Sequence, residues 1–504
     1  MHLGIDLGTT YSLVSYLNAQ GIPTLIPDQN NAREFRTPSI IHFSEEGCYV
    51  GSIVEDLLLD DPELLAHRFI KLEMGAETAV FKDAKGNDWR PEAISAIYLK
   101  KLLQDVEAQV GEDIESVVIA VPANFNDAQR RGTKIAARLA GLPTPTLIEE
   151  PIAAATFYGA SQQVEETLFI YDLGGGTFDA TVLQSSPDGL YALATQGRND
   201  IGGKTINERL IAFLSKDFQS RTGLSVDSDQ ANATRLMQFA EDAKLKLSEP
   251  GVGQVRETLF LSGTAFEIIL TRSQFEQIIE PLIDESILVC ENCLKDAGMD
   301  WSMIDRLILA GGSSMMPMVL DKLRNRSGLP GSRIATKQPH QSIAYGAALV
   351  AAQLAGKSAN SPKLHRQIAS NDLGLRVWNK ALNAPDVEVL IKRNTPLPTE
   401  YTRTFYTTRE DQTRLVIELV QKSAESIDEV QSLGHFAFGP LANPRKNLPV
   451  EITIKADMEG LLHITAKEPS SGQVINQTMG NDGESYAPWL HEQKTLVSNT
   501  PVNY

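Results

Sequence analysis

The sequence predicts an α/β domain with two similar halves that face one cleft, followed by a smaller all-β domain of sandwich type. Three observations predict this arrangement. A strand, a tight glycine turn and a second strand occur twice, and the aspartates that end the two first strands, Asp6 and Asp172, are 166 residues apart, the size of a domain. Helical and buried-strand patterns fill the interval between them. Beyond residue 372 the chain changes to short segments of alternating polarity.

The α/β part continues with helix and strand signals in turn. Residues 91–110 carry apolar side chains at helical spacing, and residues 117–121 form a short apolar run typical of a buried strand. Asp127 then caps a cationic helix that extends to Leu139. A third strand–glycine–helix unit lies at residues 307–313. This alternation places the first part of the chain in the α/β class.

The remaining chain divides by composition. Residues 357–370 are rich in Lys, Ser, Asn, Pro and Gln, so they are the best linker candidate. The alternating segments of the all-β part are 387–391, 402–406, 414–420, 450–456 and 461–466, and a turn at 457–460 joins the last two as a hairpin. We therefore expect a first domain over 1–358, a linker over 359–371, a sandwich over 372–480 and a flexible tail over 481–504.

Composition excludes several classes of protein. The 504 residues include 46 Lys and Arg against 64 Asp and Glu, a net charge of −18, and such a surface repels the phosphate backbone of nucleic acid. The apolar runs are too short to cross a bilayer, so no membrane association is expected. Three cysteines do not make a disulfide framework and indicate a reducing, cytoplasmic compartment. We interpret Cys290 and Cys293 as packed helix residues and not as a metal site.

The two glycine turns predict a phosphate-binding cleft. Glycine allows backbone N–H groups to approach phosphate oxygens closely. Asp6 and Asp172, one beside each turn, suit a hydrated Mg²⁺ held through water from opposite sides of the cleft. The residues that we expect to contact phosphate are Gly8, Thr9, Thr10, Gly174, Gly175, Gly176 and Thr177. Either turn alone is also compatible with a simple hairpin, but two turns with the same Asp placement favour the phosphate interpretation.

Seven segments, in order along residues 1 to about 479, resemble the DnaK-type chaperones, the heat-shock proteins of about seventy kilodaltons within the actin-like ATPases. They are GIDLGTTYS from Gly4, VPANFNDAQR from Val121, EEPIAAA from Glu149, DLGGGTFD from Asp172, AGGS from Ala310, AYGAA from Ala344 and LIKRNT from Leu390. The resemblance implies a two-lobed actin-like ATPase domain with duplicated ribonuclease-H-like halves, joined to a peptide-binding β-sandwich. It also implies ATP or ADP with Mg²⁺ as ligands, and leaves K⁺ open as a further cation.

The resemblance also implies roles for individual residues. Lys71 corresponds to the lysine that reaches the γ-phosphate and the attacking water, Glu150 to a glutamate in the Mg²⁺–water shell, and Asp172 to the aspartate that orients the water. Thr177 is implied to contact the γ-phosphate. Pro122 and Arg130 match a pair that relays the nucleotide state outward, and a purely structural role for either stays open. The remaining nucleotide contacts implied are Tyr11, Gly202, Gly203, Glu241, Lys244, Ser248, Gly311, Gly312 and Ser313.

The base pocket departs from the family pattern. Leu245 and Met315 stand where the family has arginines, and His340 stands where it has an aspartate. Lys204 and Thr205 replace an acidic pair after Gly202 and Gly203. Apolar side chains still cover a base, but each lost guanidinium removes stacking and cation–π energy of about 1 kcal/mol. We therefore expect ATP to bind more weakly and with less base selectivity than in typical relatives.

The all-β part matches the family's peptide-binding sandwich. The apolar pocket would use Leu375, Val377, Phe405, Leu415 and Ile417, and Trp378 and Thr408 would arch over the peptide. The alternative is that these residues pack the sandwich core, which a small sandwich needs. About 25 residues remain after the sandwich, so we expect the family's helical lid to be absent and peptide exchange to be fast.

The leading hypothesis is an ATP-dependent chaperone that binds extended apolar segments of unfolded or client polypeptides. Two alternatives stay open: a nucleotide-switched protein that binds one dedicated client, and a small-molecule kinase of actin-like fold. The family contacts a J-domain partly through an Arg, an Asn and a Thr, and these positions are Thr146, Glu149 and Ile152 here. The lost Arg and the new carboxylate of Glu149 would remove attraction for a charged partner, so we expect a dedicated J-domain co-chaperone or none. A nucleotide exchange factor is a further partner that the resemblance suggests.

Overall fold

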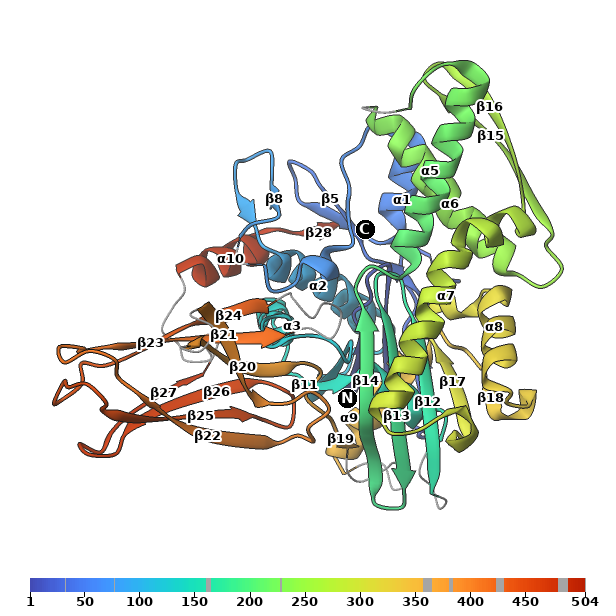
Figure 1. The fold of residues 1–504 in the computed structure, drawn as a ribbon. Coiled ribbons are helices and arrows are strands. Elements are labelled where there is room, and N and C mark those ends of the chain that lie inside the picture. The colour runs from blue at the N-terminus through green and yellow to red at the C-terminus, as the bar shows by residue number, and fades with distance from the viewer. Residues whose placement is uncertain are drawn as a thin grey trace.

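The computed structural model describes residues 1–31, 33–76, 78–159, 165–226, 229–356, 365–379, 384–422, 430–478 and 488–503. Figure 1 shows an α/β body beside a β-sandwich. The part of the expected linker before residue 365 and the part of the expected tail before residue 488 lie outside the described residues.

The first lobe is built on a sheet of order β11-β10-β1-β2-β3. Its strands are β1 (His2–Asp6), β2 (Tyr11–Leu17), β3 (Pro23–Leu25), β10 (Ser116–Val121) and β11 (Thr146–Glu149). β1 pairs antiparallel with β2 and parallel with β10, which places Asp6 opposite Leu13 on one side and Ala120 on the other. Asp6 therefore ends a strand in the middle of the sheet.

The second lobe repeats this order of pairings in a sheet β18-β17-β12-β13-β14-β19. Its strands are β12 (Glu166–Leu173), β13 (Phe178–Ser186), β14 (Gly189–Arg198), β17 (Arg306–Ala310), β18 (Ile334–Ala335) and β19 (His365–Arg366). β12 pairs antiparallel with β13 and parallel with β17, so Asp172 lies between Asp179 and Ala310. The two hairpins predicted from the sequence thus hold the same place in their sheets.

Helices cover both sheets (Figure 1). They are α1 (Ser52–Asp60), α2 (Pro91–Gln109), α3 (Asp127–Leu139), α4 (Glu150–Phe157), α5 (Gly203–Thr222), α6 (Gln230–Ser248), α7 (Arg272–Asp296), α8 (Pro317–Ser327), α9 (Ser342–Leu354) and α10 (Pro488–Asn499). Single 3₁₀ turns are η1 (Ile70–Glu73), η2 (Trp301–Met303), η3 (Gly312–Met315) and η4 (Gly331–Arg333). The expected cationic helix is α3, but its N-cap is Asn126 and not Asp127, because the Asn126 side chain and Gln129 form a capping box.

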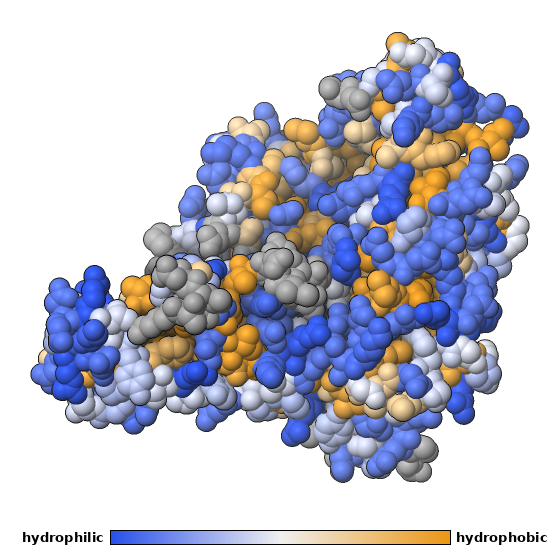
Figure 2. All heavy atoms as spheres, viewed as in Figure 1, coloured by the Kyte–Doolittle hydropathy of each residue, from blue (hydrophilic) through white to orange (hydrophobic). Residues whose placement is uncertain are grey.

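Short strands extend the upper parts of the lobes. They are β4 (Thr37–Pro38), β5 (Ile40–Phe43), β6 (Cys48–Val50), β7 (His67–Arg68), β8 (Phe81–Lys82), β9 (Asp88–Trp89) and β28 (Val502–Asn503) in the first lobe, and β15 (Gln254–Leu261) and β16 (Thr264–Thr271) in the second. In the space-filling view of Figure 2 the surface is notched between the upper parts of the two lobes.

The all-β part is a sandwich of two antiparallel sheets with orders β21-β20-β23-β24 and β22-β25-β26-β27. Its strands are β20 (Asp372–Asn379), β21 (Ala384–Ile391), β22 (Thr399–Tyr406), β23 (Leu415–Lys422), β24 (Val430–Phe438), β25 (Pro449–Ala456), β26 (Leu462–Glu468) and β27 (Gln473–Thr478). Alternate side chains of both sheets enclose a core that includes Leu419, Phe438, Ile454 and Ile464, each fully buried. The predicted hairpin between the last two alternating segments is β25–β26.

The sandwich is docked on the N-terminal end of α3. The Leu462 N–H donates to Asp127 Oδ1 at 2.7 Å, and Arg131 Nη2 donates to the Leu462 carbonyl at 2.8 Å. Lys134 forms an ion pair with Glu459 on the β25–β26 turn. The first lobe therefore holds the sandwich by its hairpin turn, through groups that are mostly buried.

The C-terminal residues differ from the expected flexible tail. Residues 488–499 form α10, which packs on α2 and α3, and β28 pairs with β6. The expectation of a flexible tail was wrong for its described part. The buried face of α10 includes a polar residue, Gln493, so the sequence shows no clear apolar pattern at helical spacing. Among the described residues, no helix is both long and apolar enough to cross a membrane.

Candidate functional site: two opposed hairpin loops

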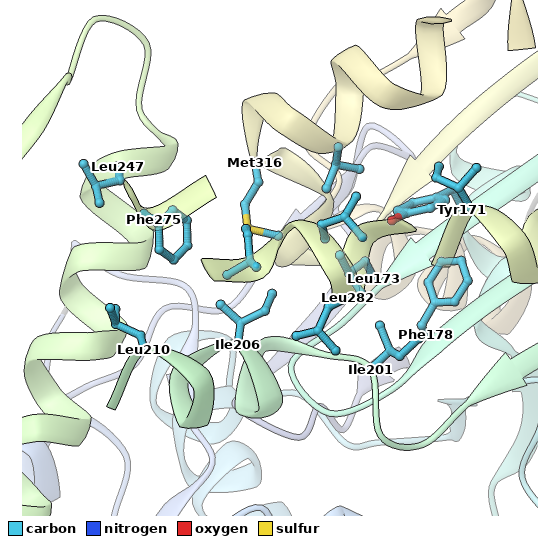
Figure 3. Close-up of a cluster of buried hydrophobic side chains, with 14 of the residues drawn as sticks. Tyr171, Leu173, Phe178, Ile201, Ile206, Leu210, Leu247, Phe275, Leu282 and Met316 are labelled. Carbon is cyan, nitrogen blue, oxygen red and sulfur yellow. The ribbon is translucent and has the colours of Figure 1, made fainter. Parts of the chain in front are cut away.

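The loops of the two hairpins meet face to face. A Cβ placed on Gly175 would lie 2.1 Å from Thr10 Oγ1, and one on Gly176 would lie 2.7 Å from the Thr9 side chain. Only glycine permits this approach. On either side of the second loop, Leu173 and Phe178 are fully buried in the core between the sheet and helices α5 and α7, as Figure 3 shows. The loop therefore projects from a rigid base.

Charged side chains from four segments gather beneath these loops. Asp6 ends β1, Asp172 lies near the end of β12, Glu150 begins α4 and Lys71 lies in η1. Lys71 Nζ donates to Glu150 Oε1 at 2.7 Å, and their side chains are 9% and 8% exposed. Asp6 is 9% exposed and Asp172 4%. A buried cation thus lies among carboxylates from both lobes.

Burial and mutual repulsion perturb these groups. Burial and the neighbouring Glu150 raise the pKa of Asp6 to about 7, although Lys71 opposes the rise. Burial, with repulsion from Glu150, raises the pKa of Asp172 well above its usual range. Burial alone would lower the pKa of Lys71, but Glu150, Asp6 and Asp172 outweigh it and raise that pKa. The cleft is an electrostatically strained site that a further cation would relieve.

Asp179 belongs to the same site, although the sequence analysis assigned it no role. It faces Asp172 across the β12–β13 pair and is 2% exposed. Burial and Glu150 raise its pKa well above the usual range. Within the described residues, Asp172 Oδ2 and Asp179 Oδ1 are buried without a hydrogen-bond partner. The signal that would have found Asp179 is its position in the glycine-loop segment itself, two residues after Thr177.

These observations fit a hydrated divalent cation and a polyphosphate. The orphaned carboxylate oxygens of Asp172 and Asp179 are acceptors of the kind that Mg²⁺-bound waters require. Thr9 and Thr177 lie on opposite loops with little exposure, so that their hydroxyls border the same space. No group of three or more His, Cys, Asp and Glu side chains in the described residues lies close enough to hold a metal directly.

The residues expected around the base lie on α5, α6 and η3. A Cβ on Gly203 would lie 3.0 Å from Lys244 Nζ and 3.2 Å from Ser313 Oγ, which brings these elements together. Lys244 Nζ pairs with Glu241 Oε2 at 2.7 Å, and Ser248 Oγ donates to the Lys244 carbonyl within its own helix.

Two apolar side chains in this region are accessible. Leu245 is 36% exposed and Met315 50% exposed. His340 is half-buried next to Gly312, and its burial lowers the pKa of the imidazole, so it is neutral near pH 7. Tyr11 lies under the Arg36 guanidinium, 5.0 Å from the ring centre. Gly202 packs against Gly176, and Gly311, at φ +75°, packs against Leu173 and Asp172.

Arg130 connects the first lobe to the segment before the sandwich and to the sandwich itself. Its guanidinium is 3.2 Å from Glu149 Oε1, 3.2 Å from Gln367 Oε1 and 3.1 Å from the Glu459 carbonyl. Pro122 is buried directly after β10 and its carbonyl accepts from Phe125 N. The expected switch pair therefore lies between the cleft and the docked sandwich.

The expected peptide-pocket residues separate into two groups. Leu375 and Ile417 are 2% and 5% exposed and belong to the sandwich core, as the packing alternative held. The half-buried residues at the edge of that core are Val377, Phe405 and Leu415. Trp378, with 60% exposure, and the exposed Thr408 lie outside it. The segments 380–383 and 423–429, which follow β20 and β23, are outside the described residues.

Two of the three positions expected to contact a J-domain point inward. Glu149 and Ile152 are fully buried and only Thr146 is partly exposed. Glu149 is held by Arg130, and burial raises its pKa to about 7 although Arg130 opposes the rise. The argument that Glu149 alters a charged surface was therefore wrong, because the carboxylate is not at the surface in this conformation.

The opposed hairpins and buried carboxylates define a two-lobed α/β protein with a charged cleft, joined to a docked β-sandwich. The family model described as Hsp70 protein matches residues 2–488. The chain is 32% identical to the chaperone protein DnaK of Thermus thermophilus, in an alignment that covers 95% of this chain and 80% of that protein. The chain belongs to the Hsp70 family.

Family membership confirms the resemblance found in the sequence. The chain is an ATP-dependent chaperone and an ATPase. The small-molecule kinase and the single-client binding protein are not favoured by these comparisons. The family implies an actin-like ATPase domain followed by a β-sandwich, and it binds nucleotide, generally with Mg²⁺, as well as client polypeptides.

Proposed function

We propose that the chain hydrolyses ATP between its two opposed hairpin loops and uses the hydrolysis to change the affinity of its sandwich for extended apolar segments. The observation that carries this proposal is the buried Lys71–Glu150 pair among Asp6, Asp172 and Asp179. It lies where the hairpin loops of both lobes converge. Burying these charges costs desolvation free energy, and bound phosphate together with a hydrated cation would offset that cost.

Each residue of the cleft then has a chemical task. Mg²⁺, when bound, would neutralise charge on the phosphates, and Asp6 and Asp172 would hold it through water. Lys71, oriented by Glu150, stabilises negative charge that develops on the transferred phosphoryl group. Asp172 orients the attacking water, and Thr177 donates its hydroxyl to a phosphate oxygen. Asp179 is a second acceptor for water or for a monovalent cation such as K⁺.

Peptide binding is assigned to the edge of the sandwich core at Val377, Phe405 and Leu415. These half-buried apolar side chains offer apolar surface to an apolar side chain of a client, whereas Leu375 and Ile417 belong to the core beneath them. Trp378, because of its large exposure, is available to cover the bound segment. Pro122 and Arg130 would transmit the state of the cleft to the sandwich through Gln367 and Glu459.

Finer features of the organisation complete the proposal. The matching order of pairings in the two lobes supports an origin by duplication of a ribonuclease-H-like unit. The proposed domain boundaries are 1–358, 359–371 and 372–480, with the linker strand β19 paired to β14 of the second lobe. A cytoplasmic location is supported by the three cysteines, which are all free and buried. A J-domain co-chaperone and an exchange factor are the partners to be tested.

The experiment that tests this function measures ATP turnover of the full chain with and without an unfolded polypeptide. We expect Mg²⁺-dependent turnover that rises when the polypeptide is present, and faster release of a labelled apolar peptide when ATP is added. Turnover that is insensitive to the polypeptide, with a release rate insensitive to ATP, would contradict the proposed switching.

A further inference from the structure

Residues 488–503, which we call the clasp, lie on the first lobe of the ATPase domain and not on the sandwich that precedes them in the chain. Figure 1 shows α10 beside α2 and β28 beside the strands of the upper first lobe. α10 contacts α2 and α3, while β28 contacts α2 and pairs parallel with β6, Val502 opposite Cys48. The chain therefore leaves the second-lobe sheet at β19, forms the sandwich and then joins the first lobe.

The clasp is part of the folded core of that lobe. Val497 is fully buried and Val502 6% exposed, and both belong to the same hydrophobic cluster as the first-lobe sheet. Leu490 and Leu496 pack against this cluster. The half-buried position 490 and the buried positions 493 and 497 recur at helical spacing along one face of α10.

Polar groups of the lobe complete the clasp. The Gln493 amide, 2% exposed, donates to the Asp88 carbonyl at 2.8 Å and accepts from the Arg90 N–H at 3.0 Å. Lys100 Nζ donates to the carbonyls of Val497 and Thr500 at 2.8 and 3.0 Å, which satisfies the C-terminal end of α10. Each of these hydrogen bonds joins a side chain to a particular backbone group, so they form only when α10 occupies this position on the first lobe.

Close backbone contact fixes the position of β28. The Cys48 N–H donates to the Pro501 carbonyl at 3.0 Å. A Cβ on the neighbouring Gly47 would lie 2.6 Å from that same carbonyl oxygen and 2.8 Å from the Pro501 ring. The lobe therefore has a glycine where the returning chain passes closest.

We propose that the clasp is a second tether that keeps the sandwich beside the ATPase domain throughout the nucleotide cycle. Ten peptide units join Thr478 at the end of β27 to Pro488 at the start of α10, and an extended chain of that length reaches about 35 Å. Residues 367–371, between β19 in the second-lobe sheet and β20, attach the other end of the sandwich. A body held at both ends by short segments cannot rotate away freely, and its effective concentration at the docking surface stays at the millimolar level or above.

The clasp limits how far the sandwich moves from the ATPase domain and does not take part in ATP hydrolysis. The proposal is therefore independent of the roles proposed for the cleft residues. When the contacts of Arg130 and Arg131 with the sandwich break, the sandwich shifts by a limited distance and returns quickly. Release of the clasp would leave a single tether and let the sandwich separate further from the lobe.

Matched variants of the full chain test the clasp from both sides of the contact. Gly47→Ala acts from the lobe and Val497→Asp from the clasp. Gly253→Ala, where an added Cβ has nothing within 4 Å, and Ser498→Asp, at an exposed site, are their controls. Hydrogen exchange should show at least tenfold faster exchange of the Cys48 amide and of the α10 amides in the two test variants, and no change in the controls.

Distance measurements then test the tether. Because the native cysteines are buried, labels at Leu59→Cys and Val474→Cys report the lobe–sandwich distance selectively. With ADP, we expect both test variants to populate longer distances than the wild type and the controls do. Wild-type amides of residues 493–502 that exchange like a free peptide would overturn the proposal. Identical distance distributions in all chains, after exchange has shown that the clasp is released, would overturn it equally, whatever the ATPase rate.

Discussion

Replacing Lys71 with alanine tests the charge arrangement of the cleft. The variant removes a cation whose Nζ lies 2.7 Å from Glu150 Oε1 and which opposes the raised pKa values of Asp6, Asp172 and Asp179. It leaves those carboxylates without their shared positive charge. The effect should therefore appear both in catalysis and in the stability of the nucleotide-free protein.

The expected magnitudes differ for the two effects. Loss of a preorganised group that stabilises transition-state charge costs about 10²–10³-fold in rate, or about 3–4 kcal/mol. Removal of one partner from a buried pair costs about 3–5 kcal/mol of folding stability. By contrast, Lys82 pairs with Asp88 at 3.1 Å on the surface, where both side chains are more than half exposed, so Lys82→Ala should cost at most about 1 kcal/mol.

Three measurements separate these effects. Single-turnover hydrolysis should fall at least 100-fold in Lys71→Ala, whereas calorimetry should still detect Mg·ATP binding because the loops and remaining carboxylates persist. Urea unfolding should show a lower midpoint without nucleotide, and Lys82→Ala should match the wild type in all three assays. A turnover rate in Lys71→Ala within a few-fold of the wild type would refute the role assigned to this cation.

Three further predictions concern the base, the client and pH. The double variant Leu245→Arg, Met315→Arg should bind ATP about 30-fold more tightly by calorimetry, since two stacking contacts contribute about 1 kcal/mol each; unchanged affinity would contradict the stacking argument. Leu415→Asp should abolish binding of an apolar peptide measured by fluorescence anisotropy, because it places a charge at the edge of the sandwich core, whereas Asp at the neighbouring Val416, 67% exposed, should not. The folded-state pKa of Glu149, about 7 against an ordinary 4.5, lies above its unfolded value, so its contribution to stability is present at low pH and lost as pH rises through about 7. Glu149→Gln should therefore flatten the fall of the urea midpoint between pH 5 and 8, and an unchanged slope would show that another group is responsible.

The sequence by itself determined the features that depend on neighbouring residues. The two hairpins, the strand at 117–121 and the β25–β26 turn follow from alternation and glycine placement, which act over a few residues. The position of Asp6 and Asp172 beside glycine turns was equally local. These patterns, read together with a family resemblance that the comparisons confirm, were enough to indicate the α/β domain, the sandwich and a phosphate cleft between two loops.

Only the tertiary structure decided which groups are buried together. The pairing of Lys71 with Glu150 joins residues 79 positions apart, and the inward turn of Glu149 depends on Arg130. Gln493 has no signal as a core residue in its own helix, because its burial depends on the backbone of Asp88 and Arg90 some 400 residues earlier. Local patterns set the conformation of a segment, but burial and pKa depend on the surface that it meets, and that surface comes from distant parts of the chain.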